Sequence, residues 1–554
     1  MPDIKIMLTS LISYLKKHRF LIIISVIYFL IRLILLDHAF LLRGERDITF
    51  TGFSLAHTGR DLYGNLLPVE FLGLDMPTPM LAFYYSALWW ILIPIKSVFT
   101  ARLPYVISST TYIFLVYELI KTITKNTKLA IITSIIFAFS PGIYHLSRLA
   151  LEVNIGMPIL LGGIILFFKK KRIWAYSLFM LAFYSYNGFR PLILPLLLFL
   201  ELYPWINGSS FKSFIKMSLI STVFFFVLFG SSILIDGRMM LSRSSDLVFM
   251  SYDEITPKVI YLRNTSVAPE VLKVVLHNKI TETIHYMIDI FVQAQDFQYL
   301  FFQGDKAAIY TSTFAGQFFL IMLPFYYAGF LFFGKNLNKK YLYILGFIPV
   351  ALVPSLVNID YISFTYRSVL ATIGYAYIIA CGFIFVMPYL SSIHKIVRAS
   401  IIGVFIIFLG IELAYFSYNY VYRRPITMFE MFFESEKDIG EYLLHSDKNY
   451  YIYDDNPRNI VTTYYFLKDK PNMTEFQQLN NQNQEFSFDG HTIVKCPSSP
   501  DDLVIEPNMI VAESCLGVDR YKEFDSSGYK TIAYEDFSFK KAFFIIESDI
   551  VPQQ

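Results

Sequence analysis

Long apolar runs separated by short polar segments dominate the first 420 of the 554 residues. A helix needs about 20 mostly apolar residues to cross a bilayer, and the runs approach or reach that length. The pattern therefore predicts a polytopic membrane bundle of about eleven helices. The expected spans lie near Arg19–Leu36, Arg102–Ile120, Leu129–Ile143, Ile155–Phe168, Ile173–Ser185, Pro191–Trp205, Ser213–Ile235, Phe314–Phe333, Tyr341–Val357, Ser368–Tyr389 and Ala399–Tyr420.

The run "MLAFYYSALWWILIPI", Met80 to Ile95, is ambiguous, and the distribution of lysine decides how we interpret it. Short cytoplasmic loops carry an excess of Lys and Arg. If Met80–Ile95 does not cross, every lysine-rich connection falls on the same side as the N-terminus. These connections are "KKHR", "KTITKNTK", "KKKR", "FKSFIK", "GKNLNKK" and "HKIVR". We therefore predict that Met80–Ile95 is a juxtamembrane or re-entrant segment packed against protein.

An odd number of spans with a cytoplasmic N-terminus places the C-terminus outside the cytoplasm. Residues 37–101 and 236–313 then form a first and a large outer loop, and 421–554 an extracytoplasmic domain. The tail combines strand-like runs ("YYIY", "HTIVKC", "MIVAE") with the helix-like "SEKDIGEYLLH". These patterns predict a small α/β domain after an all-α transmembrane domain of residues 1–420. The first apolar run lacks a small-residue cleavage site, so we expect it to remain as an anchor.

Composition supports a membrane protein and excludes a nucleic-acid binder. Hydrophobic residues make up 55% of the chain, charged residues 16%, and the net charge is only +3. The three cysteines show no metal-binding spacing, so we predict no cofactor, although a divalent metal is not excluded. Cys496 and Cys515 lie in the outer tail, where an oxidising space would permit a disulfide; two unrelated thiols are the alternative.

The short outer segments use arginine where the cytoplasmic loops use mostly lysine. The planar guanidinium grips phosphate with two parallel hydrogen bonds, so these positions fit a lipid phosphate at the outer leaflet. The alternative is that each arginine only reaches toward ordinary lipid headgroups. The arginines concerned are Arg43, Arg46, Arg60, Arg102, Arg148, Arg190 and Arg367.

Acidic residues accompany these arginines in two outer loops. The first holds Glu45, Asp47, Asp61, Glu70 and Asp75, and the second, "SPGIYHLSRLALEVN", holds Glu152. Carboxylates at a membrane boundary are costly unless they are paired or functional. One of them could act as a general base toward an incoming hydroxyl or amine while arginines hold a leaving phosphate. The structural alternative is that an arginine such as Arg46 or Arg60 merely neutralises a neighbouring acid.

Several motifs in order resemble one known superfamily. These are "TGRDLYGNLLP", "TPMLAFYYSALW", "ARLPYVISSTTYIFLVYELI", "SPGIYHLSRLALEVN", "YLFFQGDKAAIYTSTFAGQFFLIMLPFYYAGFLF" and "FTYRSVLATIGYAYIIACGF". They resemble GT-C lipid-carrier-dependent glycosyltransferases, with the nearest likeness to bacterial relatives of protein O-mannosyltransferases and to lipid A aminoarabinose transferases. The resemblance covers most of Leu41 to Tyr420. It implies inverting transfer of a hexose or pentose from a polyprenyl-phosphate carrier to a protein, lipid or glycan of the cell envelope.

The resemblance also implies a catalytic acid just after the first span. Aligned on "TGRD", the acidic pair of the family falls on Gly44 and Glu45, which is a departure. The base is then Glu45 or Asp47, with Glu152 as the next candidate. Asp47 opens the helix-like "RDITFTGFSLAHTG", where it could fix a catalytic carboxylate or simply act as an N-cap. Many relatives carry Lys-Pro where this chain has Thr78-Pro79, so either a contact to the donor phosphate or the substrate class is in question.

The remaining candidate residues fall into two groups. For the donor phosphate we expect Arg148, Arg190, Arg367 and Arg263, with Arg238 and Arg243 as further possibilities; for the acceptor or sugar we expect Arg46, Arg60, Asp61, Tyr63 and Asn154. The partners expected are a polyprenyl-phosphate-linked sugar, an acceptor and the bilayer.

Two other functions compete with this interpretation. A transporter or lipid flippase would carry ionisable groups near the bilayer midplane. The main charge inside an expected span is Arg32, which lies close enough to the outer end to reach the interface. An O-antigen ligase or polymerase, another outer-face sugar-transfer enzyme, would be expected to have its dominant loop late in the chain.

Overall fold

The computed structural model describes residues 18–68, 70–72, 77–242, 247, 252–310, 315–358, 363–469, 471–477, 485–499, 502–504, 506–516, 529–535 and 541–548. The chain divides into two compact units. The helical unit comprises Met1–Leu35 and Tyr105–Asn419. The second unit joins two distant parts of the sequence, Leu36–Pro104 and Tyr420–Gln554. The side chains of Glu70 and Arg238, and the residues Asp75 and Arg243, lie outside what the structure describes.

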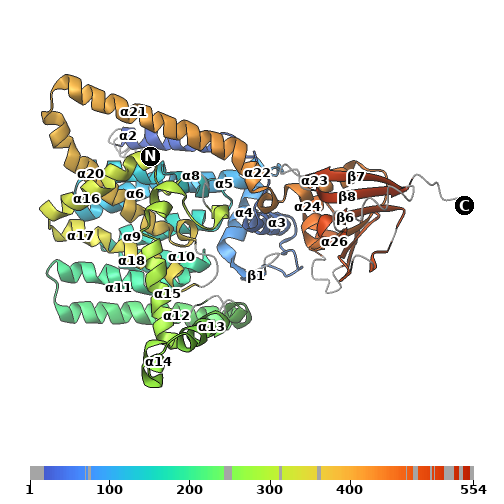
Figure 1. Ribbon diagram of the computed structural model, residues 1–554, viewed down its shortest axis with the longest axis horizontal. Coiled ribbons are helices and arrows are strands. Elements are labelled where there is room, and N and C mark those ends of the chain that lie inside the picture. The colour runs from blue at the N-terminus through green and yellow to red at the C-terminus, as the bar shows by residue number, and fades with distance from the viewer. Residues whose placement is uncertain are drawn as a thin grey trace, which may run out of the picture. The chain divides into compact units, whose positions relative to one another are not determined.

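Helices connected by short turns build the helical unit (Figure 1). They are α2 (Arg19–Leu33), α6 (Tyr112–Thr124), α7 (Thr127–Ala138), α8 (Pro141–Leu146), α9 (Val153–Phe168), α10 (Arg172–Phe183), α11 (Arg190–Ile206), α12 (Phe211–Ser242), α13 (Tyr252–Asn264), α14 (Glu270–Leu276), α15 (Lys279–Gln293), α16 (Leu323–Lys335), α17 (Lys339–Leu345), α18 (Phe347–Leu356), α19 (Phe364–Arg367), α20 (Val369–Ser392) and α21 (Lys395–Tyr418). Short η helices lie at Asn187–Phe189 (η1), Gln298–Phe302 (η3), Ala308–Tyr310 (η4) and Leu320–Met322 (η5). Helix α5 (Val98–Thr110) begins in the second unit and ends in this one.

Each of the eleven predicted spans contains a helix, but the helices differ in length. Six stretches within the described residues are long and apolar enough to cross a membrane: Val98–Thr124, Asn187–Ile206, Phe211–Leu234, Lys339–Leu356, Val369–Ser392 and Lys395–Thr427. The predicted span Leu129–Ile143 is interrupted, because α7 ends at Ala138 and α8 begins at Pro141, whose ring cannot continue a helix. The structure therefore confirms a mostly helical chain with several apolar helices, and the number eleven remains a prediction.

Small residues allow α16 and α20 to pack closely. A Cβ atom on Gly382 would overlap the carbonyl group of Phe325, and one on Gly329 would overlap the carbonyl oxygen of Ile378. Small residues at such crossings let helix backbones approach within a membrane. The ring of Phe325 stacks on that of Phe383 in the same interface, with centroids 3.7 Å apart. This contact fixes α20, and with it the short α19 that precedes it.

Arg32 of α2 lies inside the helical unit. Its Nε donates to Ser147 Oγ at 2.7 Å and its Nη2 to the Ala138 carbonyl at 2.5 Å. The guanidinium also lies over the Tyr28 ring, 3.2 Å from the centroid. The expectation that Arg32 reaches the membrane interface is therefore wrong, because buried acceptors satisfy its charge within the protein.

The second unit contains a mixed sheet in the order β4-β5-β3-β6-β8-β7. Strand β3 lies between β5 and β6 and is parallel to both. Strand β4 pairs antiparallel with β5, and β8 pairs antiparallel with both β6 and β7. The strands are β3 (Tyr451–Asp454), β4 (Glu485–Phe488), β5 (His491–Lys495), β6 (Asn508–Ala512), β7 (Tyr529–Glu535) and β8 (Lys541–Ser548). The helices of this region are α22 (Arg424–Thr427), α23 (Glu434–His445), α24 (Pro457–Leu467), α25 (Met473–Phe476) and α26 (Glu513–Leu516), with η6 (Asn419–Arg423) and η7 (Phe429–Phe432). The predicted α/β tail is confirmed.

Residues 37–101, the predicted first outer loop, fold onto this C-terminal region and share its core. The loop contains α3 (Arg43–Thr58), β1 (Glu70–Leu72), β2 (Pro77–Pro79) and α4 (Met80–Leu92). Phe53 of α3 meets Trp90 of α4 and Phe466 of α24 edge to face. These rings belong to one buried cluster with the sheet residues. Helix α4 has 13 residues, and α10, which lies in a predicted span, has 12, so helix length does not distinguish the two and the non-spanning Met80–Ile95 remains a prediction.

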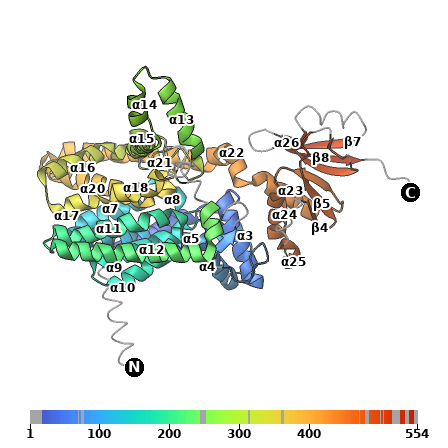
Figure 2. The same cartoon turned by 90° about the horizontal axis from the view of Figure 1, so that it is seen from below.

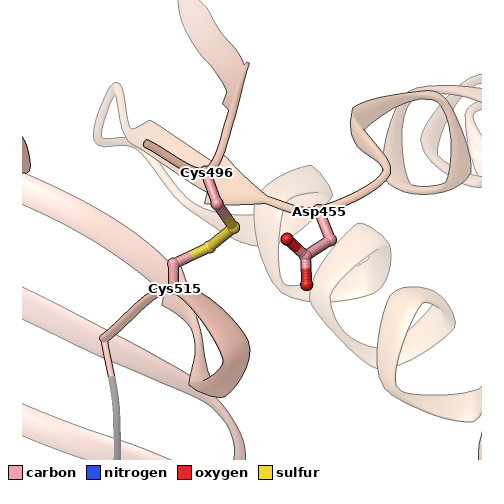
Figure 3. A group of neighbouring side chains, drawn as sticks. All are labelled: Asp455, Cys496 and Cys515. Atoms are coloured by element: carbon pink, nitrogen blue, oxygen red, sulfur yellow. A yellow bond between two sulfur atoms is a disulfide. The ribbon is translucent and has the colours of Figure 1, made fainter. Parts of the chain in front are cut away.

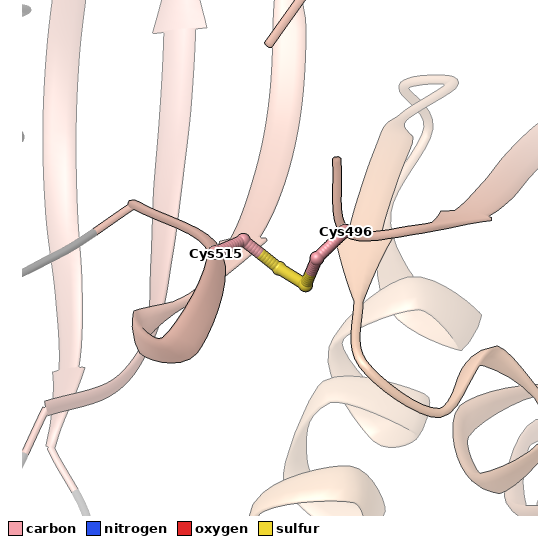
Figure 4. The surroundings of a disulfide bond; sticks show 2 residues. All are labelled: Cys496 and Cys515. Carbon is pink, nitrogen blue, oxygen red and sulfur yellow. A yellow bond between two sulfur atoms is a disulfide. The ribbon is translucent and has the colours of Figure 1, made fainter. Parts of the chain in front are cut away.

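Cys496 and Cys515 form a disulfide, with Cα atoms 5.2 Å apart. Figure 4 shows the bond between the chain that leaves β5 and the short α26 that follows β6. The bond therefore ties together the strands on both sides of β3. The predicted pairing of these two cysteines is confirmed.

Replacing both cysteines with serine is expected to destabilise the second unit by about 3 kcal/mol, because the bond restricts the unfolded chain. Thermal unfolding of the full chain in a fixed detergent measures the effect. The matched control is Cys381→Ala, which removes the buried free thiol of α20 and leaves the disulfide intact. Two free thiols in the parent protein by non-reducing mass spectrometry would contradict the pairing.

Candidate functional site

Glu45 of α3 forms a buried ion pair with Arg102 of α5. Arg102 Nε donates to Glu45 Oε1 and Nη2 to Oε2, both at 2.8 Å. The remaining N–H groups of Arg102 reach the carbonyls of Leu36, Ala39 and Phe40. Glu45 Oε2 also accepts from the backbone N–H of Leu42 at 2.9 Å. All five Arg102 donors are thus used, and the carboxylate holds the chain from Leu36 to Leu42 against α3.

Asp47 occupies the fifth position of α3. The helix begins at Arg43 with Leu42 as its N-cap, and Glu45 at the third position accepts from the N-cap backbone. The expectation that Asp47 caps this helix is therefore wrong, since the unpaired N–H groups belong to the first four residues. The earlier start follows from Glu45, whose carboxylate closes the first turn. Asp47 is buried.

Arg46 binds the C-terminal part of the second unit. Its Nη2 donates to the Asn459 carbonyl at 2.9 Å and to Thr462 Oγ1 at 3.1 Å, both on α24. The guanidinium lies 4.1 Å from the centroid of the Phe433 ring. These contacts give Arg46 a packing role between α3 and α24.

Asp61 organises the turn that follows α3. Its carboxylate accepts from the backbone N–H groups of Tyr63 and Asn65 and from the Asn65 amide. Arg60 is exposed and donates to the Gly64 carbonyl at 2.7 Å. Tyr63 packs against the buried cluster of the second unit. The structure thus brings Arg60, Asp61 and Tyr63 together in one turn.

Asn154 and Arg148 brace the second predicted loop within the helical unit. The buried Asn154 amide donates to the carbonyls of Leu146 and Leu149, and its oxygen accepts from Tyr112 at 2.9 Å. Arg148 donates to Tyr144 Oη at 2.5 Å and to the Leu35 carbonyl at 2.6 Å.

Glu152, at the N-cap of α9, contacts a group of tyrosines in the helical unit. Its Oε1 accepts from the Tyr366 hydroxyl of α19 at 2.6 Å. The Tyr366 ring stacks on Tyr310, with centroids 4.2 Å apart, and meets Tyr186 edge to face at 4.9 Å. Burial, reinforced by Glu152, raises the pKa of Tyr366 well above its usual range, so the hydroxyl remains a donor to the carboxylate.

Arg367, the last residue of α19, lies beside this group. Burial raises the pKa of Tyr186, and the charge of Arg367 opposes that rise, so the two side chains are within electrostatic reach. Arg367 Nη1 is buried and has no hydrogen-bond partner among the residues that the structure describes. A bound water or anion would satisfy such a buried donor.

The other two arginines predicted for the donor phosphate have different surroundings. Arg190 opens α11 directly after η1, with its guanidinium 5.6 Å from the Phe183 ring centroid. Arg263, on α13, donates from Nε to the His277 carbonyl at 2.7 Å and so joins α13 to the turn after α14. Figures 1 and 2 show α13 and α14 projecting from the side of the helical unit.

Sequence reasoning did not select the tyrosines that surround Glu152 or the pairing role of Arg102. The motif "FTYRS" contains both Tyr366 and Arg367, but only arginine was considered for phosphate binding. Tyr186 and Tyr310 come from segments far from Tyr366 in sequence, and no spacing rule links them.

One group of side chains among the described residues has the composition of a metal site: Asp455, Cys496 and Cys515 (Figure 3). The two sulfurs are joined in the disulfide, and the Asp455 carboxylate points toward them. A disulfide sulfur is not the thiolate that binds metal. This arrangement is therefore a structural crosslink.

A comparison with protein-family models and with curated proteins finds no match. Among solved structures, the chain is similar to the apo oligosaccharyltransferase of Archaeoglobus fulgidus, with 13% identity and a TM-score of 0.44; the match covers 82% of this chain and 64% of that one. It is similar to AglB from the same organism in complex with an inhibitory peptide and a dolichol-phosphate (11% identity, coverage 98% and 76%, TM-score 0.45). It is also similar to ArnT from Cupriavidus metallidurans bound to undecaprenyl phosphate (9%, coverage 96% and 98%, TM-score 0.39).

Proposed function

We propose that the protein is an integral membrane glycosyltransferase that moves a sugar from a polyprenyl-phosphate carrier to a protein, lipid or glycan at the outer face of the membrane. Two lines of reasoning support the proposal: the ordered motifs that resemble such enzymes, and the group of polar side chains around α19. The observation that carries it is Arg367 Nη1, a buried donor without an acceptor.

A phosphate monoester or diester is the ligand that best fits this donor. Leaving a buried charged donor unpaired costs more than the roughly 1–3 kcal/mol of a neutral group, so proteins rarely do so without a ligand. Arginine binds phosphate through its planar fork. Arg367 is the principal phosphate residue in this proposal. Arg190 and Arg148 are secondary candidates, and Arg263, already bonded to the His277 carbonyl, is the least favoured.

The proposed reaction needs one base and one anion site. The acceptor hydroxyl or amine gives its proton to a carboxylate, and its oxygen or nitrogen then bonds to the anomeric carbon. The bond between that carbon and the phosphate oxygen breaks, and the polyprenyl phosphate leaves with the electron pair. The guanidinium of Arg367 stabilises the charge that develops on the phosphate. Attack opposite the leaving group inverts the anomeric centre.

We keep Asp47 as the proposed base, on the sequence argument. Glu45, the alternative, already accepts three hydrogen bonds, from Arg102 and Leu42, and these favour a structural role. Glu152, which accepts from the Tyr366 hydroxyl, stays the next candidate base. The proposal retains eleven spans, a cytoplasmic N-terminus and an extracytoplasmic tail.

Arg367→Gln is expected to weaken binding of polyprenyl phosphate about tenfold to a hundredfold, because a hydrogen bond to a charged group contributes about 1.5–3 kcal/mol. The measurement is equilibrium binding of polyprenyl phosphate to the full chain in lipid nanodiscs. Transfer of a labelled sugar from polyprenyl-phosphate-linked donors is assayed in parallel.

The matched control is Arg398→Gln, which removes a half-buried arginine whose Nη1 lies 3.4 Å from the Ser391 carbonyl. It should bind the lipid as the parent does. Equal binding by the parent and Arg367→Gln would rule out Arg367 as the phosphate ligand. A parent chain that binds no polyprenyl phosphate would reject the proposed function itself.

A further inference from the structure

Asp305 is a buried carboxylate that the sequence motifs did not single out. It lies between η3 and η4 and is 6% exposed. Its Oδ2 accepts from the backbone N–H of Thr365 at 2.7 Å and from Ser363 Oγ at 3.1 Å. Both donors belong to the start of α19, the helix that ends in Arg367. The carboxylate is therefore held in place through one of its two oxygens.

The other oxygen, Oδ1, is buried and has no hydrogen-bond partner among the described residues. Burial raises the pKa of Asp305 to about 6, although the hydrogen bonds from α19 oppose the rise. At pH 7.5 the carboxylate is still mostly ionised, so Oδ1 is an acceptor that lacks a donor. A buried, unsatisfied acceptor points to a ligand that supplies the missing hydrogen.

The hydrogen bonds around Asp305 Oδ2 continue into a larger buried network. Thr365 donates from Oγ1 to Gln317 Oε1 at 3.0 Å, and Gln317 donates to Thr372 Oγ1 at 3.1 Å. Gln317, Thr365 and Thr372 are all buried. This chain of hydrogen bonds fixes α19 to α20, so the position of Asp305 relative to α19 has little freedom.

Helix α19 is thus linked to two unsatisfied groups, of which one accepts hydrogen bonds and the other donates them. Asp305 Oδ1 is an acceptor without a donor, and Arg367 Nη1, two residues beyond the Thr365 that binds Asp305, is a donor without an acceptor. Tyr366, which lies between Thr365 and Arg367 in the sequence, donates from its hydroxyl to Glu152. A phosphate offers the acceptor that Arg367 Nη1 lacks, and a hydroxyl or ammonium group offers the donor that Asp305 Oδ1 lacks. A sugar joined to a phosphate has this composition.

We propose that Asp305 is a specificity-determining residue whose Oδ1 accepts a hydrogen bond from a hydroxyl or ammonium group of the sugar on the lipid phosphate. The proposal rests on the proposed function, because it requires the phosphate to bind at Arg367. It predicts that the site distinguishes a carrier that holds a sugar from one that does not. The test below distinguishes a sugar hydroxyl from a sugar ammonium group as the hydrogen-bond donor to Asp305.

The decisive variant is Asp305→Asn. Oδ2 accepts two hydrogen bonds, so the amide must keep its oxygen there and present its NH₂ group at the Oδ1 position. The contacts to α19 survive, but the unsatisfied acceptor becomes a donor. A sugar hydroxyl can still accept from this NH₂, whereas an ammonium group cannot accept a hydrogen bond.

The experiment measures binding of three lipids to the full chain in nanodiscs: polyprenyl phosphate, the same lipid carrying a hexose, and the same lipid carrying an amino sugar. We expect Asp305→Asn to bind the sugar-free lipid as the parent does. We expect it to bind the preferred sugar-bearing lipid more weakly, by about threefold to tenfold for a hydroxyl contact and about tenfold to a hundredfold for an ammonium contact.

Two controls separate this role from a structural one. Ser363→Ala removes one bond to Oδ2 and leaves Oδ1 unchanged, so it should retain the preference for sugar-bearing lipid. Thermal unfolding of Asp305→Asn should match that of the parent. A parent that binds all three lipids equally, or an Asp305→Asn variant that keeps the parent preference, would overturn the role of Asp305. A parent chain that binds none of the three lipids would instead reject the proposed function.

Discussion

Asp47→Asn is expected to slow sugar transfer by about 10²–10⁴-fold, the range for loss of a general base. The amide keeps the shape of the carboxylate but cannot take the proton of the acceptor. Because the proposed phosphate ligand is Arg367, binding of polyprenyl phosphate should be unchanged. The measurement is the rate of transfer from a polyprenyl-phosphate-linked sugar, at saturating donor, together with the binding constant for the lipid.

Glu45→Gln provides the comparison for this result, since it changes the neighbouring acid in the same way. If Asp47 is the base, Asp47→Asn loses rate while the variant remains folded, and Glu45→Gln loses stability first. If both variants, made singly and together, transfer sugar at the parent rate, the acids of this loop are structural. Glu152 would then become the candidate base.

Glu45→Gln is expected to destabilise the second unit by about 3–5 kcal/mol, the cost of breaking a buried ion pair from one side. The amide cannot accept both bonds from Arg102, which is 4% exposed and would retain its charge. The thermal unfolding temperature of the full chain in a fixed detergent should fall.

A double-variant cycle tests whether this effect belongs to the pair. Arg102→Met removes the charge that Glu45→Gln leaves unpaired, so the double variant should be less unstable than the sum of the two single variants. Strict additivity would show that Glu45 and Arg102 act independently. It would contradict the role assigned to their contact.

The sequence by itself determined the helical membrane class and part of the secondary structure of the tail. Apolar runs and period-two alternation are local properties, and each is read within a single element. The runs "YYIY", "HTIVKC" and "MIVAE" became β3, β5 and β6, and "SEKDIGEYLLH" became α23. The first residue of α3 was harder to predict from the sequence, because the capping contact between Glu45 and the Leu42 backbone determines it.

Only the tertiary structure decided which polar groups have hydrogen-bond partners within the protein. Arg46 and Glu45 are adjacent in sequence, yet one binds α24 and the other Arg102 of α5. The unsatisfied atoms of Arg367 and Asp305 have no signature in sequence, since a missing partner is visible only once every neighbour is placed. The physical reason is that composition and periodicity act along the chain, whereas hydrogen-bond satisfaction and burial depend on contacts between residues far apart in it.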